Sequence, residues 1–241
     1  MRIKLNSRLL TTFDCGGIVI SDKFILTAAH CVSPKRPVLI RLGTTRLIDD
    51  NRGWYDDYQV KHIFKHPSYS VLTKRNDIAL IEVTKNIYFT DEIGPACLET
   101  DIRDQPWNVN LMVTGWGLTV DPSVNVSSRS NDLKMAQLST MPLRQCNATV
   151  IEWNKMPNVA QFRNGLSEGQ YCAYDPKGIR DACHGDSGGP LQYFNGVSSV
   201  AKIVGVVSFG VVCGGTTFPG IYTRVAYYLD WIEPIVWPNQ V

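Results

Sequence analysis

Short apolar and β-branched runs separated by turn residues occupy most of the sequence, and they constrain the fold more than any other feature. Many short strands with frequent turns are typical of a β-sandwich or β-barrel. Helical periodicity is clear only near the end, where apolar residues recur over 225–232 at i, i+3, i+4 and i+7. Pro234 is expected to end or kink that helix. The strand-like runs include Gly17–Ile20, Val38–Leu42, Ile78–Val83, Asn110–Thr114 and Ile203–Val207.

The composition narrows the class of protein. The chain has 241 residues, 44% of them hydrophobic, so it can bury a substantial core, and a single all-β unit reaches this length. The net charge is +2 and the two signs are mixed, so neither nucleic acid nor an anionic membrane is expected as a principal partner. No apolar run is long enough to span a bilayer.

Seven cysteines indicate an oxidising, extracellular compartment, although the number alone also fits a metal protein. No pair has the Cys-x-x-Cys spacing of a zinc knuckle or redox motif. Because six cysteines allow about 15 connectivities, the pairing cannot be deduced from the spacing. Residues 1–8 are too polar for a secretory signal, so we expect the sequence to lack its true start.

A glycine-rich run around one serine carries the strongest functional signal. The run extends from Asp181 to Pro190 and places Ser187 between Asp186 and two glycines. Glycine tolerates positive φ and lets another backbone approach closely, so the run can form a tight loop with its N–H groups pointing inward. Such a loop presents a nucleophilic hydroxyl and holds donors for a developing oxyanion.

This run resembles the nucleophile loop of the chymotrypsin/trypsin-type serine proteases. Two further segments resemble motifs of the same family: Thr27–Cys31 is similar to the histidine motif, and Asn76–Leu80 to the aspartate motif. The order histidine, aspartate, serine is that of chymotrypsin and differs from the order in subtilisin and the α/β-hydrolases. The resemblance extends from Cys15 to the C-terminal helix.

The resemblance implies an all-β fold, with two six-stranded antiparallel β-barrels followed by a C-terminal α-helix. One trypsin-like domain then covers residues 1–241, with the first barrel at about 1–105, the second at about 106–224 and the helix at about 225–236. The active site of the family lies in the cleft between the barrels. The first barrel is expected to supply His30 and Asp77, and the second Ser187.

The resemblance also assigns catalytic roles. A serine hydroxyl is a poor nucleophile at neutral pH, so His30 is expected to take the proton from Ser187 and deliver it to the leaving amine. Asp77 holds the imidazole in the correct tautomer, and the N–H groups of Gly185 and Ser187 form the oxyanion hole. Taken singly, the three side chains are better interpreted as a core histidine, a strand-end cap and a turn residue. Only their order inside matching motifs favours catalysis.

Specificity is expected to follow from the base of the primary pocket. Asp181 matches the position of the aspartate that trypsin-like members use to bind a substrate Arg or Lys, although an exposed loop acid is the alternative. Gly210 and Gly220 match the pocket walls and leave room for a long side chain. The segment from Ser208 to Gly210 is expected to pair in β fashion with the substrate backbone.

The cysteines follow the family pattern, except for one. The resemblance selects the disulfides Cys15–Cys31, Cys146–Cys172 and Cys183–Cys213, which leaves Cys97 without a partner. The segments around Cys97 and after Leu229 are similar to arthropod clip-domain serine proteases, including activating proteases of the Toll pathway. In that family a matching cysteine tethers the clip domain or pro-region. The implied substrate is a protease zymogen or a cytokine precursor, and the implied inhibitor is a serpin.

The N-terminus separates an active protease from a catalytically silent regulatory or binding module. Family zymogens are cut before an Ile-Val-Gly-Gly type segment, and the new ammonium pairs with the aspartate that precedes the catalytic serine, here Asp186. Only 14 residues precede Cys15, and none form such a segment. Burying a carboxylate without a partner costs several kcal/mol, so the chain as written is expected to relax its oxyanion loop and to be inactive.

Weaker signals concern modification and metals. Asn125 and Asn147 begin sequences with the form of glycosylation acceptors, which chance alone could supply. A calcium loop is the less favoured interpretation of an acidic segment, because it lacks clear ligand spacing and Thr44 stands where calcium-binding trypsins carry a glutamate. We therefore expect no metal and no cofactor. The acidic residues of that segment are Asp49, Asp50, Asp56 and Asp57.

Overall fold

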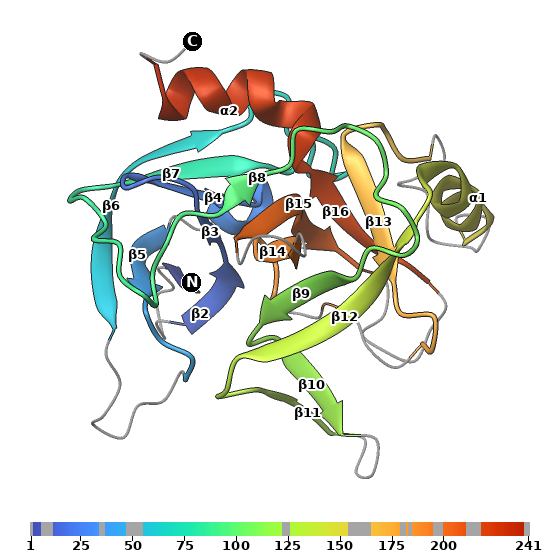
Figure 1. Ribbon diagram of the computed structural model, residues 1–241, viewed down its shortest axis with the longest axis horizontal. Helices are drawn as coiled ribbons and strands as arrows, with labels where there is room; N and C mark the ends of the chain where they lie inside the picture. The colour runs from blue at the N-terminus through green and yellow to red at the C-terminus, as the bar shows by residue number, and fades with distance from the viewer. Residues whose placement is uncertain are drawn as a thin grey trace.

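The computed structural model of the chain describes residues 2–5, 12–33, 37–46, 55–121, 126–153, 165–178, 182, 185–194, 200–210 and 218–238. They form two seven-stranded sheets and a separate hairpin, with a few short helices (Figure 1). None of these helices is long and apolar enough to cross a membrane. The helices are η1 (Ala29–Val32), α1 (Leu143–Trp153), η2 (Val225–Tyr228) and α2 (Leu229–Val236).

The first sheet has the order β2-β1-β5-β6-β7-β4-β3. This seven-stranded half-barrel stands where a six-stranded barrel was expected. Only Gly17 separates β2 from β3, so its two edge strands follow one another in the chain. The N-terminal segment forms β1 between β2 and β5, and its Ile3 is fully buried. The strands are β1 (Arg2–Leu5), β2 (Thr12–Gly16), β3 (Ile18–Val19), β4 (Phe24–Thr27), β5 (Pro37–Leu42), β6 (Asp56–Lys65) and β7 (Ala79–Val83).

The second sheet closes on itself. Pairing of β14 with β15 completes a ring of six antiparallel strands, β14-β9-β12-β13-β16-β15, which confirms the predicted barrel; β8 adds to β15 in parallel. A hairpin of β10 (Leu118–Asp121) and β11 (Val126–Arg129) extends from it. The remaining strands are β8 (Cys97–Leu98), β9 (Leu111–Gly115), β12 (Lys134–Met141), β13 (Gln170–Tyr174), β14 (Pro190–Phe194), β15 (Ala201–Phe209) and β16 (Gly220–Arg224).

Two helical features differ from the sequence-based expectation. Helix α1 was not predicted. Among its residues whose burial is described, Cys146 and Val150 are buried, and Asp104 accepts the N–H of Leu143 at the start of the helix at 2.9 Å. At the C-terminus, Pro234 lies inside α2 instead of ending it. The proline removes a bond to the carbonyl of Asp230, which is exposed and can bind water instead.

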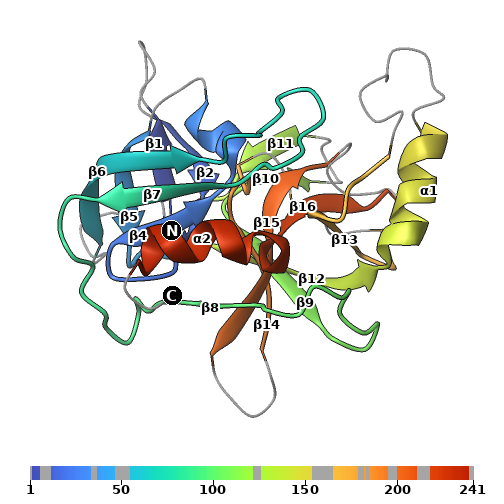
Figure 2. The ribbon, with the colours of Figure 1, turned by 90° about the horizontal axis from the view of Figure 1, so that it is seen from above.

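The C-terminal helix packs on the first sheet although it follows the second barrel in the chain. Figure 2 shows α2 lying across β4 and β7. Ile232 is fully buried there, in one cluster with Ile25 and Leu80 of the first sheet and Ile203 of the second. A separate cluster that includes Leu111, Leu191 and Tyr222 fills the second barrel. The helix therefore contacts both halves of the molecule and helps to hold them together.

We expect Ile232→Ala to lower the free energy of unfolding by about 2–5 kcal/mol, because it removes buried methyl groups and leaves a cavity between α2 and the first sheet. Denaturant unfolding followed by fluorescence measures this loss. Leu72→Ala is the control, since Leu72 is 75% exposed and its truncation should change the midpoint little. Equal midpoints for the two variants would show that α2 does not help to hold the halves together.

Candidate active site

His30 and Asp77 form the centre of the site. His30 lies on η1, which begins two residues after the end of β4, and Asp77 lies two residues before the start of β7. The ring Nδ1 of His30 lies 2.7 Å from Oδ2 of Asp77, and the backbone N–H of His30 donates to Oδ1 at 2.8 Å. The carboxylate thus accepts a hydrogen bond from Nδ1–H of His30. This bond fixes the imidazole in the tautomer whose Nε2 can accept a proton.

The Asp77 carboxylate is completely buried, and the second barrel supplies further donors to this residue. Ser208 Oγ donates to Oδ2 at 2.5 Å, and Thr223 Oγ1 donates to the backbone carbonyl at 2.8 Å. A buried charge is tolerated only when its acceptors are paired. Sequence reasoning assigned Ser208 to substrate pairing and did not single out Thr223, because neither lies near Asp77 in the chain.

The bend before Asp77 is held by the C-terminal segment. Asn76 has a positive φ of 55°, which asparagine tolerates better than most residues. Its side chain donates to Ser68 O at 2.8 Å and accepts from Tyr228 OH at 2.9 Å. Burial, and next the neighbouring Tyr227, raise the pKa of Tyr228, so its hydroxyl stays protonated and keeps donating. His66 packs edge-on against Tyr228, and burial lowers the pKa of its imidazole.

The predicted nucleophile loop is tight, as its glycines suggest. Gly185 and Gly188 have φ of 105° and 78°. The N–H of Gly16 on β2 donates to Ser187 O at 2.7 Å, and the N–H of Gly188 donates to Val207 O at 2.8 Å. A Cβ on Gly188 would collide with Thr27 Oγ1 and lie 2.6 Å from Gly16 O. Glycine therefore lets the loop press against the first sheet.

The backbone of Ser187 lies next to the segment that carries His30. The disulfide Cys15–Cys31 ties η1 to β2, and the Ser187 carbonyl lies 3.6 Å from the Sγ of Cys31. The structure thus pairs His30 with Asp77 and places the backbone of Ser187 beside Cys31, the residue that follows His30. Although Cys15, Cys31 and His30 could be taken for a metal cluster, both sulfurs belong to the disulfide and His30 Nδ1 is bound to Asp77.

Asp186 is held within the chain. Its Oδ1 accepts the N–H of Gly117 at 2.8 Å, and a Cβ on Gly117 would lie 2.6 Å from its Cγ. The partner that we expected to be missing is therefore replaced in part by a backbone donor. Beside this carboxylate lies a cavity of about 260 Å³, whose lining includes Thr45, Trp116, Leu133 and Gly185.

The predicted specificity pocket is described only in part. Asp181 lies outside the described residues. Phe209 on β15 pairs with Ile221 on β16, so Gly210 and Gly220 lie opposite one another just beyond that pair. Gly210 is exposed and Gly220 is buried.

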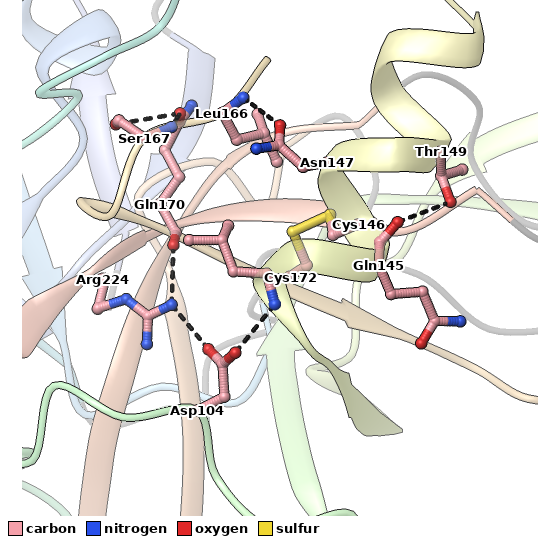
Figure 3. The surroundings of a disulfide bond; sticks show 11 residues. Asp104, Gln145, Cys146, Asn147, Thr149, Leu166, Ser167, Gln170, Cys172 and Arg224 are labelled. Atoms are coloured by element: carbon pink, nitrogen blue, oxygen red, sulfur yellow. Dashed lines mark hydrogen bonds and ion pairs between the residues drawn. A yellow bond between two sulfur atoms is a disulfide. The ribbon is translucent and has the colours of Figure 1, made fainter.

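The structure contains two of the three implied disulfides, Cys15–Cys31 and Cys146–Cys172. The second disulfide joins α1 to β13 (Figure 3). Asp104 lies beside it, and its Oδ1 accepts a hydrogen bond from Arg224 at 2.7 Å. Cys183 and Cys213 lie outside the described residues. Cys97 on β8 carries an exposed free thiol.

The weaker sites receive little support from the geometry. Asn147 lies within α1, and its Oδ1 accepts the N–H of Leu166 at 2.6 Å, so this amide is engaged within the protein. Of the acidic residues proposed for calcium, Asp57 forms a two-bond ion pair with Arg41 at 2.8 and 2.9 Å. Asp56 is exposed. Asn125, Asp49 and Asp50 lie outside the described residues.

Sequence similarity to known proteins extends over nearly the whole chain. The family model described as Trypsin matches residues 2–232. The chain is similar to serine protease Hayan of Drosophila melanogaster, with 41% identity over 99% of this chain but only 37% of that protein. Serine protease snk of the same species is 34% identical over 95% of this chain and 50% of its own length. The clotting factor G beta subunit of Tachypleus tridentatus is 34% identical over 95% of this chain and 73% of its own length.

Gly188→Ala is expected to destabilise the fold by about 1–3 kcal/mol, because it combines a side chain at positive φ with a collision against β2 and β4. Gly94→Ala is the matched control, since a Cβ at Gly94 meets no atom within 4 Å. The midpoints of thermal unfolding compare the two. The close approach of the loop to the first sheet is contradicted if both variants unfold at the wild-type temperature.

Proposed function

Since the chain belongs to the trypsin family of serine proteases, we propose that it is a secreted serine endopeptidase that cleaves after arginine or lysine. The observation that carries the proposal is the fully buried Asp77 carboxylate, paired with His30 Nδ1 at 2.7 Å. Because Nδ1 is bound to Asp77, the other ring nitrogen of His30, Nε2, can act as the base. The two disulfides support an oxidising, extracellular setting.

In the proposed reaction, Nε2 of His30 removes the proton of Ser187 Oγ while that oxygen attacks the substrate carbonyl carbon. The N–H groups of Gly185 and Ser187 donate to the resulting oxyanion. The imidazolium then protonates the leaving amine, and a water molecule, deprotonated by the same nitrogen, hydrolyses the acyl-enzyme. Asp77 stabilises the imidazolium throughout and stays ionised.

The proposed specificity rests on Asp181 at the base of the pocket and on glycines at its walls. A carboxylate in a water-poor pocket binds a guanidinium or ammonium strongly and leaves a neutral side chain poorly matched. The opposed positions of Gly210 and Gly220 support an opening free of side chains on that edge. Asp181 therefore selects the residue before the scissile bond.

The proposed role is a step in an extracellular proteolytic cascade of Toll-type immunity or development. The relatives include a clotting factor subunit and phenoloxidase-activating factor 3 of Holotrichia diomphalia, which is 35% identical over 92% of this chain. The substrate class is then a protease zymogen or a cytokine precursor, and the inhibitor a serpin. Exposed Cys97 is the proposed tether to a clip domain or pro-region.

Asp186 is the proposed acceptor of an activating ammonium, which the adjoining cavity of about 260 Å³ has room to admit. A silent, zymogen-like regulatory module is the second candidate function. It is favoured by the bond from the N–H of Gly117 to Asp186 Oδ1 at 2.8 Å, which gives one oxygen of the carboxylate a donor other than an ammonium. Reaction of Ser187 with a fluorophosphonate, followed by mass spectrometry, separates the two: rapid stoichiometric labelling supports the enzyme.

Peptides that differ only in the residue before the scissile bond test the proposed specificity. We expect Arg and Lys peptides to be cleaved at least about a hundredfold better than Phe, Leu or Ala peptides, because only a cation pairs with the Asp181 carboxylate. Ser187→Ala should abolish cleavage, while Asp181→Asn should keep the triad but lose the preference. Faster cleavage after Phe or Leu contradicts the assignment of Asp181.

Mapping the disulfides of the natural protein tests the tether. We expect a peptide that contains Cys97 to be joined to a peptide from outside residues 1–241, because Cys97 is exposed and unpaired in the described part of the domain. Cys97→Ser should then release the two parts after activation, as non-reducing electrophoresis would reveal. A bond from Cys97 to another cysteine of the domain would contradict the tether.

A further inference from the structure

A contact between the two halves of the molecule borders the cavity beside Asp186. Residues 44–46, which follow β5 and belong to the first half, meet residues 132–133 of the second half. The N–H of Leu133 donates to Thr45 O at 2.7 Å, and Arg46 and Asp132 form a β-bridge and an ion pair at 3.0 Å. We refer to this contact as the Thr45 clasp.

Trp116 joins the clasp to the centre of the site. Its ring N–H donates to the same Thr45 carbonyl at 3.0 Å, across 71 residues of sequence. The side chain is 4% exposed, so the orientation of its ring is fixed by the protein and not by solvent. Trp116 lies between Gly115 and Gly117, and this short segment is therefore anchored to the first half of the molecule.

The anchored segment supports the nucleophile loop at two points. The N–H of Gly117 donates to Asp186 Oδ1 at 2.8 Å. Gly185 packs against the same segment, because a Cβ placed on it would lie 3.1 Å from the Cα of Gly117. The loop residue proposed to supply an oxyanion donor and its neighbour thus both rest on a backbone whose position depends on Trp116.

We propose that Trp116 is a positioning residue, which fixes the oxyanion loop through the Thr45 clasp. The expected effect on kcat rests on the proposed function, whereas the expected effect on the structure of the loop does not. The ring N–H couples residues 44–46 to Gly185 and Asp186, so a displacement of that segment is transmitted to the oxyanion donors. The wall of the cavity beside Asp186 includes both Thr45 and Trp116.

Hydrogen exchange measured by mass spectrometry tests the coupling without requiring any hydrolysis. In Trp116→Phe, we expect the amides of residues 185–189 to exchange about tenfold faster, because one buried hydrogen bond of the chain of contacts is lost. Trp107→Phe is the matched control, since Trp107 is 86% exposed, and its exchange should equal that of the wild type. Strands β12 and β13 should keep their protection in both variants.

A second variant separates the hydrogen bond from the volume of the ring. Replacement of Trp116 by β-(3-benzothienyl)alanine keeps the bicyclic shape and removes only the N–H donor, so it should fold even if Trp116→Phe does not. We expect the same faster exchange at 185–189. Unchanged protection in this variant, or faster exchange spread over the whole protein, would overturn the proposed positioning role.

Kinetics supply a readout that general destabilisation would not produce. With an arginyl peptide amide, kcat should fall about tenfold while KM stays within about twofold, because oxyanion donors act mainly on the transition state. Equal losses in kcat for Trp116→Phe and Trp107→Phe would overturn the inference. If Ser187→Ala still hydrolyses the peptide, the proposed function fails, yet the exchange result continues to decide the role of Trp116.

Discussion

The arrangement of the molecule depends on the burial of one carboxylate. Asp77 is fully buried, and its carboxylate is paired with His30 of the first half and Ser208 of the second, while Thr223 of the second half donates to its backbone carbonyl. A buried charge with missing partners costs several kcal/mol, so the carboxylate is tolerated only when the halves are docked in this relation. The docking of the halves and the orientation of the His30 ring, which Asp77 holds, therefore depend on one another.

The nucleophile loop meets the first half through its backbone instead of its side chains. The bond from the N–H of Gly16 to Ser187 O requires an approach that only glycine at 188 permits. The loop is also linked to the first half indirectly, because Asp186 accepts from Gly117 and the neighbouring Trp116 donates to Thr45. Ser187 thus lies in a loop that contacts the first half directly at Gly16 and indirectly through Trp116.

Local sequence patterns predicted much of this architecture. The glycines around Ser187 were predicted to form a tight loop, and Gly185 and Gly188 do adopt positive φ. The apolar runs became strands, with β7 and β15 within or overlapping the expected ranges. Helix α1 could not be predicted in this way, because its few buried positions give a weak pattern and its start depends on Asp104, which is distant in the chain. The disulfide pairing could not be deduced from spacing, which leaves many connectivities open.

The sequence by itself determined the family, the strand-rich fold and the candidate triad, since these depend on residue types within short segments. Only the tertiary structure decided what holds the triad in place. The bonds from Ser208 and Thr223 to Asp77 span 131 and 146 residues, and the bond from Trp116 to Thr45 spans 71. Hydrogen bonds across such separations form where barrel curvature and core packing bring strands together. No local pattern of residues predicts which of these distant residues come together, because their contacts depend on how the two halves dock.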